Sequence, residues 1–287
     1  MLHAQEASEL SFRYGLASAR SVALGEALVA DTRDLSSAIA NPASLLFLER
    51  LSVSATAGMR TDNRSLRSAV SMPIAATDRF VLAIGGEGAF FDADDWSAQK
   101  GKMAGFEASS AVRLFGAFSF GMIYDFRYTE FGATRLSSHS GGMGLMYSVL
   151  PALSYGVSFT GFGSGIQLKR AADGAPFLVK ESNIPRSVTF GASWRYPATY
   201  GRKLVEVHLS NQSISGVERL VYRLGAEFFP WKFLVVRGGI VSGPVTAMGR
   251  AGIGIHTGVV DIDYGVASST AAERLHVLSI VVPLEFP

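Results

Sequence analysis

Apolar and polar residues alternate along many short stretches of this chain, most clearly at residues 118–130. In that stretch one side carries large apolar and aromatic residues, and the other carries small, polar and charged ones. Because successive side chains of a β-strand point to opposite faces, the pattern predicts a strand with two different surroundings. Residues 187–197 and 219–230 show the same division. The apolar faces are expected to contact lipid and the polar faces an aqueous lumen, since an Arg or Lys facing the bilayer midplane costs about 2–4 kcal/mol.

Fourteen stretches fit such strands: 50–58, 65–75, 79–91, 102–114, 118–130, 141–150, 153–166, 187–197, 203–211, 219–230, 233–242, 245–256, 259–267 and 274–286. Most have about ten residues or more, which suits a tilted strand crossing a bilayer. An even number of strands can close into a barrel. We therefore predict an all-β fold, a fourteen-stranded antiparallel transmembrane β-barrel over residues 49–287. A soluble β-sandwich is the alternative, but it would need a very large core to bury so many apolar faces.

The connections between the predicted strands alternate in length. Those after the second, fourth, sixth and tenth strands are tight, whereas those after the third, fifth, seventh and thirteenth are longer, the longest at 167–186. Residues 197–202 and 242–244 break the alternation. Outer-membrane barrels place short turns in the periplasm and long loops outside. We therefore expect a bacterial outer-membrane protein with both termini in the periplasm.

Residues 1–48 precede the strands and differ from them. They contain helix-like segments at 17–30 and 34–40, with Asp34 as a candidate N-cap. Pro42 restricts Asn41 to extended geometry, so the second helix should end before it. This part of the chain predicts a mostly helical hatch, or plug, packed against the barrel.

Composition supports a membrane protein without transmembrane helices. The chain is 48% hydrophobic yet 17% charged, and its long apolar stretch at 277–284 is far shorter than the roughly 20 residues of a spanning helix. The absence of cysteine excludes thiolate chemistry and disulfides. A net charge of +2 without a basic run makes nucleic acid an unexpected partner. The first residues lack the positive and apolar regions of an export signal, so we expect a signal peptide that was removed or truncated.

Charged residues on the predicted inner faces are candidates for a network that fills the lumen, because opposite charges on neighbouring strands satisfy one another. A selective polar channel is the alternative, although a pore would show one dominant sign at its constriction. The candidates are Glu107, Arg113, Asp125, Arg127, Arg195, Glu206, His208, Arg223, Glu227, Arg237, Arg250, His256, Asp261 and Asp263.

His208 and Ser210 give the sharpest signal for an enzyme. The spacing resembles the His-x-Ser-Asn of outer-membrane lipid hydrolases, in which the imidazole activates the hydroxyl. Both residues, however, share a face with Glu206 and should point into the lumen, away from lipid. We therefore expect a protein that is not an enzyme.

No cofactor or metal site is predicted. The acidic segment 91–95 lacks the glycine and the distal glutamate of a calcium loop. The glycine pairs 85–86 and 238–239 are followed by no helix, so they predict kinks or close approaches inside strands and not phosphate loops.

The N-terminal segment resembles that of the PorV/PorQ proteins, a branch of the FadL-like outer-membrane barrels. The resemblance covers about 30 residues: Ser18-Ala19-Arg20, Ala23-Leu24-Gly25, the acidic positions Asp31 and Asp34, and Asn41-Pro42-Ala43. Glu26 departs from the pattern, because these families often have a second glycine there. By this resemblance, Arg20, Gly25, Asp34, Asn41, Pro42 and Ala43 would organise or gate the plug.

The resemblance implies a non-enzymatic component of type IX protein secretion that acts through protein partners in contact with outer-membrane lipid. The alternatives are a FadL-like transporter, in which the hatch gates passage of a hydrophobic ligand, and a lipid hydrolase that uses His208 and Ser210. The chain is short for a FadL transporter, which favours the secretion branch.

Overall fold

The computed structural model describes residues 18–48, 50–61, 65–92, 100–131, 134–150, 152–163, 166–172, 175–182, 184–197, 204–243, 247–268 and 274–284. The first three elements are α2 (Ala19–Ala23), α3 (Ser37–Ala40) and the 3-10 helix η1 (Pro42–Phe47). The strands are β1 (Ser52–Arg60), β2 (Leu66–Ala76), β3 (Phe80–Asp92), β4 (Lys100–Phe115), β5 (Phe118–Phe131), β6 (Thr134–Leu150), β7 (Leu153–Phe162), β8 (Ile166–Ala172), β9 (Ala175–Ser182), β10 (Ser187–Tyr196), β11 (Val205–Ile214), β12 (Val221–Trp231), β13 (Leu234–Ser242), β14 (Ala247–His256), β15 (Asp261–Ser268) and β16 (Arg274–Pro283).

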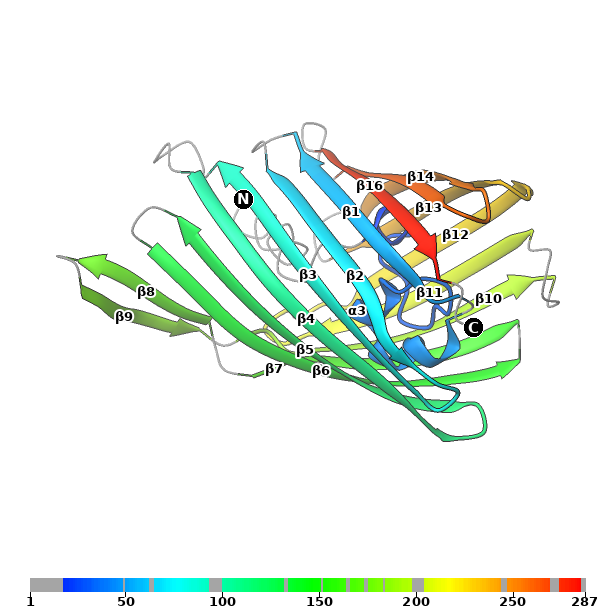
Figure 1. Ribbon diagram of the computed structural model, residues 1–287, viewed down its shortest axis with the longest axis horizontal. Helices are drawn as coiled ribbons and strands as arrows, with labels where there is room; N and C mark the ends of the chain where they lie inside the picture. Colours follow the sequence, from blue (N-terminus) through cyan, green and yellow to red (C-terminus); the bar gives the residue numbers. More distant parts are fainter. Residues whose placement is uncertain are drawn as a thin grey trace.

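Fourteen of these strands form a closed antiparallel barrel (Figure 1). Neighbours along the chain pair with one another, β7 pairs with β10, and β1 pairs with β16 to close the ring. This confirms the predicted fold class. Within the part of the chain that the structure describes, no helix is long and apolar enough to cross a membrane.

The two faces of the strands are those predicted from the alternation. On β5, Met122 and Tyr124 are 55% and 44% exposed on the outside, whereas Ser119 is fully buried on the inside. On β11, Leu209 faces outward while Glu206 and His208 are fully buried. Apolar side chains thus cover the outside of the barrel, which is the pattern that a transmembrane β-barrel requires.

The sequence predicted long connections at residues 131–140 and 167–186, and the structure contradicts part of this prediction. Residues 134–140 continue β6 and pair with β5, leaving only 132–133 between the two strands. Residues 166–182 form the hairpin β8–β9, which pairs with the start of β6 and extends from the end of the barrel (Figure 1). Residues 134–140 are mostly polar, so the alternation that identifies the other strands is missing there.

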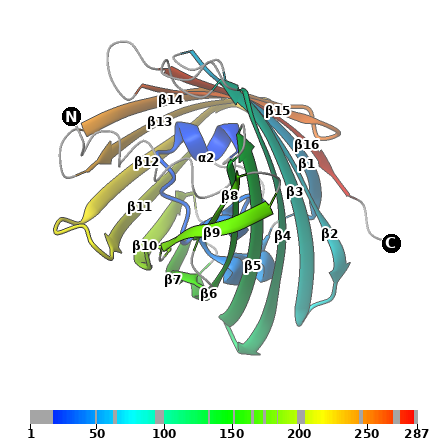
Figure 2. The same ribbon diagram turned by 90° about the vertical axis from the view of Figure 1, so that its left-hand side faces the viewer.

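Residues 18–48 lie inside the ring of strands, as Figure 2 shows for α2, and we call them the plug. Helix α3 ends at Ala40 and Asn41 is extended, as the proline predicted. The first helix is shorter than predicted and ends at Ala23. The chain turns there because Gly25 and Glu26 both have left-handed backbone angles, with φ of 65° and 60°. Glycine adopts this region freely but glutamate does not, so Glu26 occupies a position where glycine would be the less strained residue.

The connections after β2, β4, β6, β10, β12 and β14 share one end of the barrel, which we call the turn end. Four of them are tight, at residues 77–79, 116–117, 151–152 and 232–233. The plug joins β1 at this same end. We call the opposite end, which carries β8 and β9, the loop end. Tight turns are therefore more frequent at the turn end, as the sequence predicted, although the two-residue connection between β5 and β6 is at the loop end.

Candidate functional site

Eight strands present a glycine to the plug, and we call these residues the glycine ring. A Cβ atom added to any of them would lie closer to a plug atom than real Cβ contacts come. Because glycine has no side chain, the backbone of the plug can lie directly on the barrel wall. The ring consists of Gly121, Gly144, Gly156, Gly191, Gly225, Gly239, Gly252 and Gly265.

The glycine ring confirms part of the sequence analysis. Gly239 belongs to the pair 238–239, where a close approach inside a strand was predicted, and its partner in that approach is the plug backbone at Leu24 and Gly25. Serine hydroxyls on the wall bind plug carbonyls beside the ring. Ser119 donates to the carbonyl of Ala43 at 2.8 Å and Ser154 donates to that of Ala30 at 2.6 Å.

Asn41, at the turn after α3, is fully buried and links the plug to the barrel wall by hydrogen bonds. Its amide nitrogen donates to the carbonyl of Val29 at 2.7 Å and to that of Leu145 in β6 at 3.1 Å. Its amide oxygen accepts from the backbone N–H of Ala43 at 3.1 Å, which caps η1. One side chain thus ties two plug segments to the barrel, next to Gly144 of the glycine ring.

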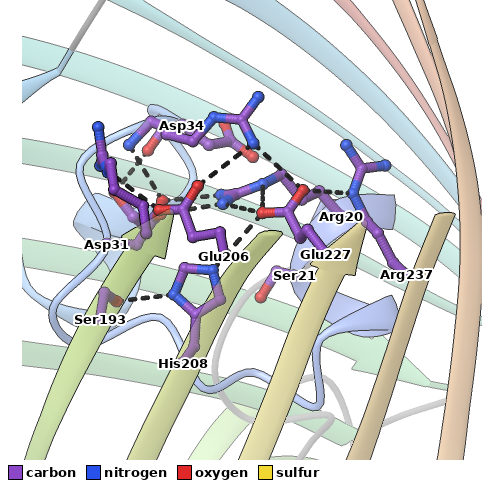
Figure 3. Close-up of polar contacts among 12 residues, drawn as sticks. Arg20, Ser21, Asp31, Asp34, Ser193, Glu206, His208, Glu227 and Arg237 are labelled. Carbon is purple, nitrogen blue, oxygen red and sulfur yellow. Dashed lines mark hydrogen bonds and ion pairs between the residues drawn. The ribbon is translucent and has the colours of Figure 1, made fainter. Parts of the chain in front are cut away.

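Arg20 joins the plug to the opposite wall through ionic hydrogen bonds (Figure 3). Its Nη1 and Nη2 donate to the two carboxylate oxygens of Asp31 at 2.7 and 2.9 Å, and its Nε donates to Oε1 of Glu227 at 3.0 Å. Glu227 also accepts from Nε of Arg237 at 2.8 Å and lies 3.3 Å from Nη1 of Arg33. Charge-assisted pairs of this kind are about twice as strong as neutral hydrogen bonds.

The same group of charges extends to β10, β11 and β15. Arg195 donates to the hydroxyl of Thr32 at 2.6 Å and lies 3.4 Å from Glu206, and Arg237 also pairs with Asp263. Four guanidinium groups thus face four carboxylates, so the buried charges balance. We call this set the anchoring network: Arg20, Asp31, Arg33, Arg195, Glu206, Glu227, Arg237 and Asp263.

The anchoring network keeps Asp31 ionised. Burial on its own raises the pKa of this carboxyl group, but the adjacent guanidinium of Arg20 outweighs burial and holds the pKa well below its usual range. Asp31 is fully buried and stays negatively charged at physiological pH. The Arg20–Asp31 pair is therefore intact under the conditions in which an outer membrane works.

His208 points into the lumen, as the sequence predicted, and lies beneath the plug. Its Nδ1 bonds to the hydroxyl of Ser193 at 2.7 Å, and its Nε2 lies 3.5 Å from Glu227. The hydroxyl of Ser210 has no hydrogen-bond partner among the described residues. The pairing that a hydrolase needs, histidine to Ser210, is thus not formed in this geometry, and the absence of enzymatic activity stays a prediction.

Asp31, Glu206 and His208 are the described residues that could hold a metal ion, since their ligand atoms lie within 4.8 Å of one another. Both carboxylates already face arginines: Asp31 binds Arg20, and Glu206 lies 3.6 Å from Arg33. These fixed positive charges oppose a divalent cation at the same place. The geometry favours ion pairing within the anchoring network over metal binding.

A second group of charges lies on β2–β5, across the barrel from the anchoring network. Arg67 lies 2.9 Å from Glu87, and Nε of Arg127 lies 3.0 Å from Glu87 and 3.1 Å from Asp125. Glu107 stands opposite Asp125 in the strand register. We call these five residues the β2–β5 cluster.

Opposite charges on neighbouring strands pair within each half of the barrel, and the plug crosses the lumen, so the predicted network is divided into two groups. Six predicted residues belong to neither group: Arg113, His208, Arg223, Arg250, His256 and Asp261. Arg113 donates to the backbone carbonyl of Asp78 in the β2–β3 turn and to that of Gly116 in the β4–β5 turn. Arg250 lies 3.7 Å from Glu26 of the plug.

Sequence reasoning missed four members of these groups as site residues: Asp31, Arg33, Arg67 and Glu87. Arg67 and Glu87 are in phase with inward-facing neighbours, but small residues occupy many positions of β2 and β3 and blur the alternation. Asp31 and Arg33 lie in an extended part of the plug, where no periodic pattern assigns a face. The sequence offered one signal for Asp31, namely that it is an acidic position in the segment that resembles PorV/PorQ proteins.

A cavity lies between the plug and strands β1–β5. Leu35, Ala38 and Ile39 line its plug side. Hydroxyl and carboxylate groups line much of the barrel side: Ser54, Thr56, Ser71, Glu87, Glu107, Ser109 and Asp125. Its free volume is about 50 Å³. A water molecule needs about 10–15 Å³ on this measure and an engineered cavity that binds benzene has about 150 Å³, so this cavity has room for a few waters and not for an aromatic ring.

Two adjacent glycines of β3 lie beside this cavity. Gly85 faces the lumen and Gly86 faces lipid, so both sides of β3 lack a side chain at adjacent positions. On the lipid side Gly86 separates Val70 of β2 from Phe106 of β4 in the register. All four residues border the cavity. We call Gly85 and Gly86 the glycine window.

Comparisons with known proteins identify the fold. No family model matches this chain, and no curated protein matches it. Among solved structures, it is similar to the toluene transporter TbuX of Ralstonia pickettii, with 13% identity over 95% of this chain and 99% of that one and a TM-score of 0.67. The monoaromatic hydrocarbon channel CymD gives 13% identity, coverage of 94% and 98%, and a TM-score of 0.67. A FadL homologue of Pseudomonas aeruginosa gives 10%, 95% and 100%, and 0.63. The chain therefore has the barrel fold of FadL-like outer-membrane proteins.

Proposed function

We propose that this protein is an outer-membrane channel for small hydrophobic compounds, closed by its plug. The cavity carries the proposal, because it begins at apolar plug residues and borders a place where the wall lacks side chains on both faces. Solved structures with this fold are named as transporters or channels of toluene and monoaromatic hydrocarbons, which supports the same class of cargo. The turn end would face the periplasm.

In this proposal the plug is the gate. The cavity is too small for an aromatic ring in the closed state, so segment 35–39 has to shift before a compound can enter. The compound then leaves sideways through the glycine window into the bilayer, where an apolar molecule is more stable than in periplasmic water. In this proposal the protein catalyses no reaction. It provides a route by which the compound bypasses the polar outer surface of the membrane.

Replacing Gly86 with leucine is expected to reduce uptake of toluene to that of cells lacking the protein, because the new side chain fills the gap between Val70 and Phe106. The measurement is accumulation of labelled toluene by bacteria that produce each variant in the outer membrane. Gly238→Leu is the matched control, since an added Cβ at Gly238 on the opposite wall meets nothing. Equal uptake by the Gly86 variant and the wild type would rule out this exit.

The second candidate is a component of type IX secretion, which the resemblance of residues 18–43 to PorV/PorQ proteins favours. A balanced and largely buried anchoring network suits a plug that stays in place while the protein acts through partners. Purification of the tagged full-length barrel from its own outer membrane, followed by identification of bound proteins, separates the candidates. Stable association with secretion components, together with no toluene uptake, would replace the first proposal by the second.

A further inference from the structure

We propose that a groove on the outer face of strands β10–β13 binds an acyl chain of lipid A, a lipid whose chains include amide-linked chains that carry hydroxyl groups. The groove lies on the lipid-facing wall, apart from the plug and the cavity. The inference therefore goes beyond the proposed function and uses only the orientation given there. It follows from the order of polar and apolar side chains along the groove.

The groove is formed by neighbouring strands of the barrel (Figure 2) and has a free volume of about 520 Å³. Pockets that hold small ligands have about 300–1,000 Å³. In the strand register Ala192 of β10 lies between Tyr155 of β7 and Leu209 of β11, so a small side chain separates two large ones. The large side chains of the groove are 42–56% exposed on the outside of the barrel: Tyr155, Phe190, Leu209, Tyr222, Leu224 and Ile240.

The side chains of the groove form two rows across the strands. Asn211 of β11 is opposite Tyr222 of β12, which is in turn opposite Ser242 of β13, and we call these three residues the polar row. The next outward-facing row, two residues nearer the turn end, is entirely apolar and consists of Leu209, Leu224 and Ile240. A lipid has the same order, with a polar linkage followed by a hydrocarbon chain.

The polar row lacks partners within the protein. Among the residues that the structure describes, none forms a hydrogen bond with the side chain of Asn211, Tyr222 or Ser242. A polar group that faces hydrocarbon without a hydrogen bond is unfavourable, because no water is present to replace the missing partner. A ligand that supplies these hydrogen bonds is therefore stabilised at the row.

The polar row carries no charge. Arg223 also borders the groove, but it is out of phase with Tyr222, and its guanidinium donates to Gln212 on the inner face at 2.6 Å. A neutral row does not favour a phosphate group. It favours the neutral linkage between a headgroup and its acyl chain.

The donors and acceptors of the row distinguish an amide linkage from an ester. The Asn211 amide both donates and accepts, as do the hydroxyls of Tyr222 and Ser242. An ester linkage of a phospholipid only accepts, so it would leave the amide oxygen of Asn211 unpaired. An amide-linked hydroxyacyl chain both donates and accepts, so it pairs the whole row. With the turn end in the periplasm, the row near the loop end lies in the outer leaflet, where lipid A is found.

The test uses the purified full-length protein in detergent and adds either lipid A or a phosphatidylethanolamine with chains of equal length. Native mass spectrometry measures bound lipid at each concentration. We expect the wild type to bind lipid A at least about tenfold more tightly, because two additional neutral hydrogen bonds together contribute about that much. Asn211→Leu should bind the two lipids equally. Ala192→Leu should lose lipid A, since the larger side chain fills the groove while the polar row stays intact.

Ser68→Leu is the matched control, because Ser68 is an exposed polar residue on the outer face of β2, and this variant should keep the wild-type preference. Heat-dependent migration on gels verifies that each variant forms a barrel. Equal binding of the two lipids by the wild type would overturn the inference, as would an Asn211→Leu protein that keeps the preference or a stable dimer that covers the groove in place of lipid. Toluene uptake through β3 is measured separately, so either proposal can fail while the other stands.

Discussion

Replacing Glu227 with glutamine is expected to release the N-terminal half of the plug from the barrel. Glu227 is fully buried and accepts hydrogen bonds from Arg20 of the plug and Arg237 of the wall. Removing one partner of a buried ionic pair leaves the other charges uncompensated, which costs roughly 3–5 kcal/mol. At 1.4 kcal/mol per factor of ten, the plug should open at least about a hundredfold more often.

Hydrogen exchange measures this opening directly. Backbone amides of residues 19–31 should exchange at least about a hundredfold faster in Glu227→Gln, while amides of β5–β7 keep their protection, since the barrel itself is intact. Glu130→Gln is the matched control, because its pair with Lys102 is exposed and such pairs contribute little. Plug amides that exchange as slowly in Glu227→Gln as in the wild type would show that the anchoring network does not hold the plug.

A double variant locates the effect within the network. Asp31→Asn and Glu227→Gln both act on the guanidinium of Arg20, so their effects on exchange should be less than additive. Independent, additive effects would mean that the two carboxylates stabilise the plug by separate contacts.

Replacing Gly156 with valine is expected to displace the plug by steric exclusion. A Cβ at this position would overlap the carbonyl oxygen of Val29 and approach the amide nitrogen of Asn41 at 2.9 Å. Backbone cannot yield as a flexible side chain can, so the plug segment around Val29 must leave the wall. The Asn41 hydrogen bonds to Val29 and Leu145 would be lost with it.

Single-channel conductance in planar bilayers reports this displacement. The wild type is expected to be nearly closed and Gly156→Val to conduct ions steadily through the lumen. Gly249→Val is the matched control in β14, where an added Cβ has no atom within 4 Å, and it should behave as the wild type. A Gly156→Val barrel that folds but stays closed would contradict the role of the glycine ring.

The local sequence determined the barrel and its two faces. A side chain's direction alternates at every residue of a strand, so the face of Met122 or of Glu206 follows from its own neighbours and needs no knowledge of distant contacts. The same local reasoning ended α3 before Pro42, because the proline ring restricts the residue before it. It failed for residues 134–140, which are mostly polar and carry no alternation, and for the hairpin at 166–182.

Only the tertiary structure decided what the inner faces meet. Arg20 and Glu227 are 207 residues apart in sequence, and no periodicity specifies that the plug lies across β12 and not across β3. The sequence predicted the same inward facing for Glu107 and Glu227. In the structure Glu107 borders a cavity, whereas Glu227 contacts three guanidinium groups. That difference depends on how the plug is folded within the closed ring, because pairing is a property of distances in space and not of position along a strand.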